Sequence, residues 1–412
     1  MRKIYTSVDI GSDSIKVLVG ELYNNKLNVL ATSTVRSKGI KKGLIVDANE
    51  ALATIRDAIS EIEGKLLITI DKVIASVPAY YSSFEIVNGE IKINSEEYKI
   101  TGNDIVKVLQ VAVKRKMKED RELVTVIPIH FTVNDSKNIK DPKNMIGKKL
   151  GVKAMMVTTP SKNVLSIMSI FSSLGIDVVD INLGSIADYS EFRNNAMDKS
   201  VSAIINIGYE TTTVSLFNKG IIINSEIIQI GSKNIDNDIS YVFKIDKNES
   251  SKLKETFAVA HKKFSRVNEV KEAVTVNKDV ISITQYDISQ VVMSRLMEIL
   301  KLAKKQTYLL TNREISYIII TGGISEIPGL SYLMDELFGN NTKIGNIDTI
   351  GIRSNKYSTV SGLIKCFDNK LELRNKEYSM IGFDNEEELS SEKKKVNDSS
   401  VLGKVFGYFF DN

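Results

Sequence analysis

Short apolar runs alternate with longer amphipathic stretches along most of the chain. The runs are rich in Val and Ile and bounded by Gly, Pro or Asn, which predicts β-strands; they include IYTSVDI, SIKVLVGEL, VTVIPIHFTV, AIINIG, TTVSLFN, GIIINSEIIQI and SYIIITGG. Between them, ANEALATIRDAISEIEGK carries four apolar residues at helical spacing: Leu52, Ile55, Ile59 and Ile62. Gly64 is placed to end this helix. Strands that alternate with helices predict an α/β fold.

One strand–turn–strand pattern occurs twice. VDIGSDSIKVLV (Val8 to Val19) aligns without gaps on INIGYETTTVSL (Ile205 to Leu216). Gly11 and Gly208 lie at the turns, and hydroxyl residues follow each of them. Two such hairpins, about 200 residues apart, predict a duplicated fold whose turns face each other.

The last part of the chain has a different composition. Residues 384–399 mix charge runs with serine and have almost no apolar residues, which predicts a flexible linker. After it, six apolar residues fill one arc of a helical wheel: Val401, Leu402, Val405, Phe406, Phe409 and Phe410. We expect residues 400–412 to form an amphipathic helix that folds as its apolar face enters a bilayer interface. The alternative is a helix that docks on the protein's own core.

Overall composition excludes several classes of function. Lys+Arg 55 against Asp+Glu 51 leaves +4, too balanced for nucleic-acid binding through bulk charge. Cys366 is the one cysteine, which predicts a reducing compartment, and the two histidines, His130 and His261, show no metal-ligand spacing. The start of the chain lacks a signal-peptide pattern, and no run approaches the ~20 apolar residues of a membrane span. We expect a cytoplasmic protein, at most attached to the inner face of a membrane.

The two hairpin turns have the chemistry of an anion site. Glycine at a turn lets backbone N–H groups approach an anion, and Ser12 and Ser14 can add donors. Asp9, at the end of the first strand, can hold magnesium through water. In YIIITGGISEIPGL (Tyr317 to Leu330), a strand runs into a Gly-Gly turn that would let a base or ribose lie against backbone. One such turn alone is more often purely structural, but the three together favour a nucleotide site.

These motifs resemble the actin/Hsp70/sugar-kinase superfamily and, within it, the FtsA family of bacterial cell-division proteins. VDIGSDSIKVLVGE resembles that family's opening D-I-G-x-x-K-V-x-x-L-V-G-E, and KGIKKGLIVDANEALATIRDAI resembles the segment before its first helix. VIPIHFTVND, KDPKNMIG, IQIGSKNIDNDISYVF, ITGGISEIPGL and YSTVSGLI follow in the family's order and spacing. Each motif is weakly specific, whereas the ordered set is strongly specific and spans nearly the whole chain.

The resemblance implies a two-lobed actin-like fold in four subdomains. The expected ranges are 1–80, 162–199 and 351–383 for the first core, 81–161 for an inserted α/β subdomain, 200–235 and 314–350 for the second core, and 236–313 for a cap. It also implies ATP with Mg²⁺ as cofactor. The nucleotide-binding residues would be Asp9, Gly11, Ser12, Asp13, Ser14, Gly208, Thr211, Thr212, Lys254, Gly322, Gly323 and Ile324.

The phosphate loops depart from the family pattern. The second loop is D-I-G-G-G-T-T in the family and NIGYETT here, so Asn206 replaces a carboxylate that would help to organise magnesium. Tyr209 and Glu210 replace glycines and add bulk and negative charge beside an incoming phosphate. Asp13 replaces a small neutral residue, and Ser251 stands where a ribose-binding glutamate would be. We expect weak or absent ATP turnover, and whether the loops bind nucleotide or persist as scaffold stays open.

The resemblance implies a non-enzymatic adaptor that ties FtsZ filaments to the cytoplasmic membrane at the division site. Its partners would be the acidic, apolar C-terminal tail of FtsZ, the inner leaflet, other division proteins and further copies of itself in protofilaments. The FtsZ tail would dock on the 236–313 subdomain, where Arg295 falls on a family arginine. The alternatives are a pilus-assembly actin-like protein, which would not need the apolar tail, and a sugar or small-molecule kinase, against which Asn206 speaks.

Overall fold

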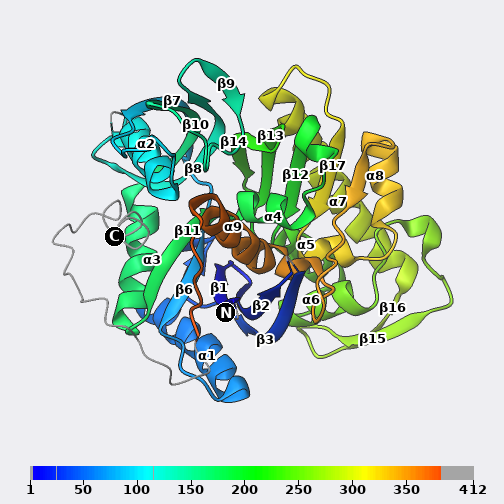
Figure 1. Ribbon diagram of the computed structural model, residues 1–412. Helices are drawn as coiled ribbons and strands as arrows, with labels where there is room; N and C mark the ends of the chain where they lie inside the picture. Colours follow the sequence, from blue (N-terminus) through cyan, green and yellow to red (C-terminus); the bar gives the residue numbers. More distant parts are fainter. Residues whose placement is uncertain (1–2, 25, 115, 382–412) are drawn as a thin grey trace.

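The computed structural model describes residues 3–24, 26–114 and 116–381, and its two lobes each contain a five-stranded sheet (Figure 1). The linker expected at 384–399 and the amphipathic helix expected at 400–412 lie outside the described residues.

The first sheet has the strand order β11-β6-β1-β2-β3. Its strands are β1 (Lys3–Ile10), β2 (Ser14–Tyr23), β3 (Lys26–Arg36), β6 (Lys72–Val77) and β11 (Asp177–Leu183). Alternation along β1 sends Val8 to the face covered by α1 (Ala48–Leu66) and α3 (Ser161–Ser173). Tyr5 points to the other face, where α9 (Ser358–Arg374) packs. The sheet is therefore buried on both sides by helices.

The second sheet repeats the topology of the first, in the order β14-β13-β12-β17-β18. Its strands are β12 (Val201–Ile207), β13 (Thr212–Asn218), β14 (Ile221–Ile228), β17 (Tyr317–Thr321) and β18 (Thr342–Ile344). Both sheets combine an antiparallel three-strand meander with two parallel strands. The hairpin register also repeats, because Asp9 lies opposite Lys16 and Asn206 lies opposite Thr213. The duplication expected from the sequence is confirmed.

The helices α4 (Gly184–Phe192) and α9 lie between the two sheets (Figure 1). On α4, Tyr189 stacks on Phe217 of the second sheet, with ring centroids 4.1 Å apart. The backbones of α4 and α9 approach so closely at Gly362 that a Cβ there would lie 1.9 Å from the carbonyl oxygen of Ala187. Glycine at 362 is thus a packing requirement of the helix pair that joins the lobes.

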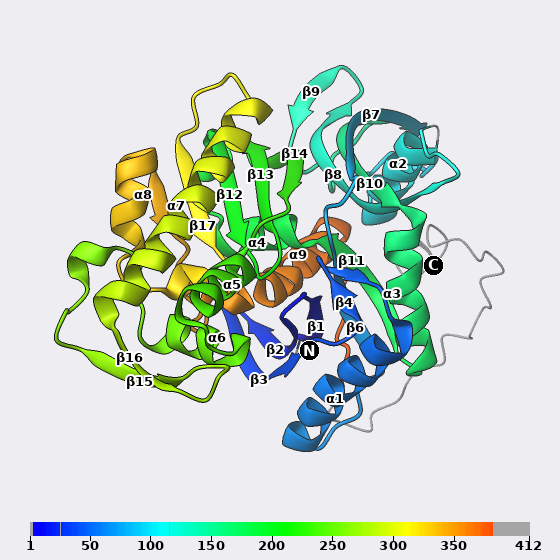
Figure 2. The ribbon, with the colours of Figure 1, turned by 180° about the vertical axis from the view of Figure 1, so that it is seen from behind.

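The inserted subdomain has its own sheet and core. The sheet order is β7-β10-β8-β9, formed by β7 (Ser83–Lys92), β8 (Arg121–Val133), β9 (Ser136–Ile139) and β10 (Lys149–Pro160). The helix α2 (Gly102–Lys114) packs its apolar face on this sheet, with Ile105, Val108 and Leu109 fully buried. The subdomain lies on the β14 side of the second lobe, where β7 contacts β14 (Figure 2). The fold class expected from the sequence is therefore confirmed.

The second lobe differs from expectation in how its 236–313 segment is used. The helices α5 (Ser232–Phe243) and α8 (Leu330–Phe338) cover the second sheet, and so does α7 (Gln285–Leu310), which falls inside the range expected to form a separate cap. Val292 and Leu296 of α7 share one apolar core with Val214 of β13. The segment also contains α6 (Lys247–Thr256) and the ribbon of β15 (Val270–Val274) and β16 (Val280–Thr284), which projects from the lobe (Figure 2). Leu253, Ala273 and Ile283 of these elements belong to the same core.

Helix α1 continues past the residue expected to end it. Gly64 lies inside the helix, which ends when Leu67 adopts a left-handed conformation (φ 56°) and its N–H donates to the carbonyl of Glu63. Gly64 is exposed, and nothing lies within 4 Å of the position a Cβ would take. Glycine lowers helix propensity but does not by itself break a helix that is held by its buried face.

Candidate functional site

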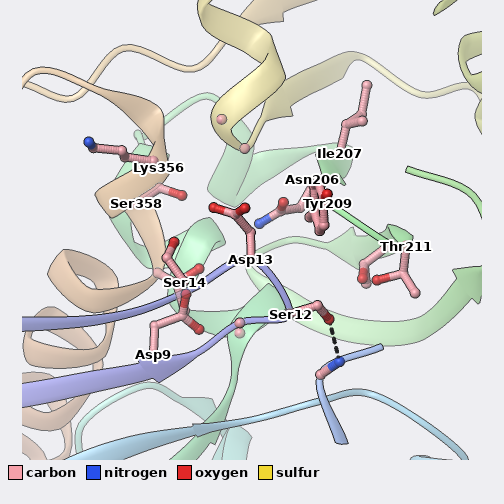
Figure 3. Close-up of a pocket in the computed structure, with 18 of the residues that line it drawn as sticks. Asp9, Ser12, Asp13, Ser14, Asn206, Ile207, Tyr209, Thr211, Lys356 and Ser358 are labelled. Carbon is pink, nitrogen blue, oxygen red and sulfur yellow. Dashed lines mark hydrogen bonds between the residues drawn. The ribbon is translucent and has the colours of Figure 1, made fainter. Parts of the chain in front are cut away.

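A cavity of about 530 Å³ lies between the lobes and is lined by both hairpin turns (Figure 3). The first hairpin contributes Asp9 and Gly11, and the second contributes Asn206 and Gly208. The turns end the paired strands β1–β2 and β12–β13, so the duplicated topology brings two equivalent glycine turns to one cleft. This is the arrangement expected from the sequence repeat.

Of the nucleotide-binding residues expected from the sequence, all but Thr212 line this cavity. Thr212 is fully buried, and its hydroxyl donates to the carbonyl of Ile230 at 2.8 Å. Its neighbours Thr211 and Thr213 do line the cavity, because alternate strand residues face opposite sides. Thr212 therefore stabilises the hairpin rather than lining the site.

The Gly322-Gly323 turn contributes two different properties. Gly322 has φ 97°, and a Cβ there would lie 2.4 Å from the carbonyl oxygen of Ile207, so only glycine fits between the turn and the second hairpin. Gly323 has no atom within 4 Å of its missing Cβ. Its backbone is therefore open to a group that enters the cavity.

Asp9 is held by two partners at the bottom of the first hairpin. It accepts a hydrogen bond from the Ser76 hydroxyl at 2.8 Å, and its other oxygen lies 3.4 Å from the Lys16 ammonium. The sequence motifs did not single out Lys16, although its place opposite Asp9 across the hairpin puts it on the cavity side. The Ser12 hydroxyl accepts the N–H of Gly43 at 2.7 Å, and its own proton stays free to be donated (Figure 3).

Lys254 lines the cavity, but a carboxylate already neutralises its charge. Its ammonium lies 2.7 Å from Asp236, and the two side chains are 4% and 2% exposed. Burial raises the pKa of the Asp236 carboxyl above its usual value, while Lys254 counteracts this effect. Ser251, one turn earlier in α6, is half-buried and does not line the cavity.

Glu210 does not add negative charge to the cavity, contrary to the expectation from its sequence position. Its carboxylate accepts the backbone N–H of Lys42 at 2.5 Å and lies 2.6 Å from the Lys233 ammonium. Burial would raise the pKa of Glu210, but the bonds from Lys233 and Lys42 hold it below its usual value. Lys42 belongs to the hairpin of β4 (Ile40–Lys41) and β5 (Leu44–Ile45) in the first lobe, and its ammonium bonds Gln229 of the second. Glu210, in the second lobe, thus forms a hydrogen bond to the first lobe and stabilises the contact between them.

A buried carboxylate, Asp188, lies behind the second hairpin. It accepts the side-chain N–H of Asn206 at 2.6 Å and the hydroxyls of Ser358 and Thr359 at 2.7 and 2.9 Å. Burial raises its pKa to about 6, although these three hydrogen bonds oppose the shift. Asp188 lines the cavity and lies in the middle of α4. Sequence reasoning missed it, because the acidic residues of GSIADYSEF belong to no motif.

Arg295 lies away from the cavity and is already paired. Its guanidinium donates to both oxygens of Asp238, at 2.6 and 2.9 Å, and to Glu298 at 2.5 Å. The hydrogen bonds that Arg295 donates to the Asp238 carboxylate raise the pKa of Arg295. The carboxylate of Asp238, on α5, therefore occupies the side of the guanidinium that an acidic ligand would bind.

The described residues contain no group of three or more His, Cys, Asp or Glu side chains placed to hold a metal ion. They also contain no helix long and apolar enough to span a membrane.

Solved structures of similar fold identify the class of protein. A PilM–PilN type IV pilus biogenesis complex matches with a TM-score of 0.57 at 14% identity, covering 87% of this chain and 97% of that one. MreB5 of Spiroplasma citri bound to ADP matches with a TM-score of 0.55 at 13% identity, covering 91% and 99%. Two duplicated lobes around a cleft lined by paired glycine turns define an actin-like fold.

Sequence comparisons identify the family within that class. Residues 203–362 match the family model "Cell division protein FtsA", and residues 81–158 match "SHS2 domain inserted in FTSA"; together they cover more than half of the chain. The cell division protein FtsA of Bacillus subtilis (strain 168) is 28% identical over 365 residues, covering 88% of this chain and 83% of that protein. The chain belongs to the FtsA family of cell-division proteins.

Proposed function

We propose that this protein holds FtsZ filaments at the cytoplasmic face of the membrane during division and helps to recruit the other division proteins. The observation that carries the proposal is the paired family match, which includes both the second lobe and the inserted subdomain. Actin-like folds serve many functions, so the likeness to PilM and MreB5 does not distinguish among them. The family match favours division over pilus assembly or a kinase reaction.

We propose that the cleft binds ATP with Mg²⁺ and turns it over slowly. The cavity fits such a ligand, because Gly323 leaves its backbone open and the Gly11 and Gly208 turns face each other across the cleft. Turn N–H groups and the Ser12 hydroxyl would hold phosphates, and Asp9 would hold the ion through water. Bound Mg²⁺ would neutralise phosphate charge. We expect slow turnover because Tyr209, which stands where the family pattern has glycine, lines the cavity and adds bulk beside the phosphates.

We propose that the FtsZ tail docks beside the Arg295–Asp238 pair. This pair joins α5 to α7, and both side chains are partly exposed, at 27% and 29%. A carboxylate of an acidic peptide could replace Asp238 in the guanidinium fork, because Arg binds carboxylates through two parallel hydrogen bonds. Docking at this surface would therefore require the intramolecular pair to open.

We propose that residues 400–412 attach the protein to the membrane. The support is the sequence: Phe406, Phe409 and Phe410 share one face with Val401 and Val405. One tail of this length binds reversibly, whereas the tails of several copies in a protofilament bind far more firmly. The same protofilaments would present many FtsZ-docking surfaces to one FtsZ filament.

Phe406→Glu should release the protein from lipid vesicles. Burying a phenylalanine contributes roughly 1.5–3 kcal/mol, so losing one and introducing a charge should lower vesicle binding at least about tenfold. The measurement is co-sedimentation of the full chain with phosphatidylcholine vesicles containing a minority of phosphatidylglycerol. Gly407→Glu is the matched control, since it adds the same charge on the polar side of the same segment. Equal loss in both variants, or no loss in Phe406→Glu, would contradict a face-specific anchor.

A further inference from the structure

We infer that Asp188 supplies the carboxylate that the second phosphate loop lacks, and that it acts with Asp9 to position the magnesium ion of a bound nucleotide. This inference rests on the proposed nucleotide binding.

The hairpin repeat shows where a second carboxylate belongs. Asn206 occupies in the second hairpin the position that Asp9 occupies in the first, opposite Thr213 as Asp9 is opposite Lys16. Asn206 donates its side-chain N–H to Asp188 at 2.6 Å, and both residues line the cavity. The negative charge therefore lies on Asp188 of helix α4, one hydrogen bond away from the position on strand β12 where the first hairpin's pattern would place it.

Among the described residues, Asp188 differs from every other buried carboxylate in what balances its charge. Asp180 lies 2.8 Å from Lys370, Glu191 lies 2.9 Å from Lys365, and Asp236 lies 2.7 Å from Lys254. Asp368 likewise lies 3.1 Å from Lys3. Asp188 is 0% exposed, and its three hydrogen-bond donors are all neutral groups. A buried carboxylate without a cation, on the wall of a ligand cavity, is a site for a cation that arrives with the ligand.

A purely structural role does not require this charge. An asparagine at 188 could accept from Ser358 and Thr359 through its oxygen and donate to Asn206 through its nitrogen. It would tie α4 to α9 and β12 without the cost of burying an ion. The charge therefore serves something other than the three hydrogen bonds.

The geometry also fits the way magnesium binds. A carboxylate has about four acceptor positions, and three of those on Asp188 are used. Mg²⁺ on a nucleotide keeps several waters and needs only one or two protein carboxylates. Asp9 and Asp188 provide two, and the negative charge of Asp9 is felt at Asp188. This arrangement agrees with the lack of a three-ligand metal cluster in the described part of the chain.

The test moves the carboxylate between the two positions. ATP affinity is measured by calorimetry with excess Mg²⁺ and with EDTA, for the full-length wild type, Asp188→Asn, and the exchange variant that combines Asp188→Asn with Asn206→Asp. We expect Mg²⁺ to raise the ATP affinity of the wild type. In Asp188→Asn this gain in affinity should be at least tenfold smaller, while the affinity measured in EDTA should not change. The exchange variant should recover most of the gain. Ser358→Ala removes one hydrogen bond to Asp188 but keeps its charge, so its Mg²⁺ dependence should stay that of the wild type.

The outcomes separate this inference from the proposed function. If Asp188→Asn weakens ATP binding equally with Mg²⁺ and with EDTA, or if Ser358→Ala loses the Mg²⁺ dependence as well, Asp188 is only a structural tie. If Asp188→Asn does not fold, an exchange variant that folds but shows no Mg²⁺ dependence overturns the inference. If the wild type binds no ATP in either condition, nucleotide binding itself is wrong. ATP binding that Mg²⁺ does not strengthen overturns only the role of Asp188.

Discussion

Gly362→Ala adds one methyl group at the contact between α4 and α9. We expect it to destabilise the folded protein more than a methyl group added at any other position of this contact. The added Cβ would lie 1.9 Å from the carbonyl oxygen of Ala187 and 3.0 Å from its Cα. Overpacking a core usually costs about 1–3 kcal/mol when side chains can adjust, but here the obstacle is backbone, so the helices must separate. Separation would disturb the core that α9 shares with Tyr5 and Leu18. We expect a loss of about 3 kcal/mol or more, or insoluble protein.

Gly64→Ala is the matched control for this substitution. The change in covalent structure is the same, but Gly64 is exposed in the last turns of α1 with no atom near its missing Cβ. Alanine should stabilise the helix there by about 0.5–1 kcal/mol. Urea denaturation of both variants measures the difference. A Gly362→Ala protein as stable as the wild type would contradict the close backbone contact between α4 and α9 at this position.

Asp236→Ala should cost about 3–5 kcal/mol, because it leaves the Lys254 ammonium buried without its counter-ion. Lys254 is 4% exposed and has a carboxylate at 2.7 Å, so water cannot replace the lost partner without opening the α5–α6 contact. The same substitution should distort the cavity wall that Lys254 forms. The measurement is the free energy of unfolding from urea titration, with the midpoint and slope compared with the wild type.

Asp238→Ala, two residues along the same helix, tests whether burial is the cause. Asp238 also has a cationic partner, Arg295, but this pair is 27% and 29% exposed and should be worth at most about 1 kcal/mol. Replacing both buried partners, as Asp236→Leu with Lys254→Met, should restore most of the stability lost in Asp236→Ala, because no ion is then left in the core. Equal losses in the two single alanine variants would contradict this explanation.

The fold was largely predictable because its signals are local. The turn glycines and alternating apolar residues of Val8–Val19 and Ile205–Leu216 were sufficient to predict two equivalent hairpins facing one cleft. The use of α7 was not predictable in this way, because an amphipathic pattern shows that a helix has a buried face but not which surface covers it. The end of α1 at Leu67 was missed for a similar reason, since the buried face of the helix outweighed the weak preference of Gly64.

The site was predictable where a motif defines it and not where a distant partner does. Gly11, Gly208 and Gly322 were identified from turn chemistry, and all three line the cavity. The direction of the Glu210 side chain depends on Lys42, which is 168 positions away in the chain. The environment of Asp188 is likewise set by hydrogen-bond donors on other elements, and no pattern along the sequence shows that these residues lie together.

One reconstitution tests directly whether this protein links FtsZ to a membrane, as we propose. FtsZ from the source organism is assembled with GTP, mixed with vesicles and with the full-length protein, and the vesicles are recovered by flotation so that free filaments stay behind. We predict that FtsZ floats with the vesicles when the wild type is present and stays behind with Phe406→Glu. If the wild type floats with the vesicles but FtsZ stays behind, the protein binds the membrane without linking FtsZ to it, and the account is contradicted.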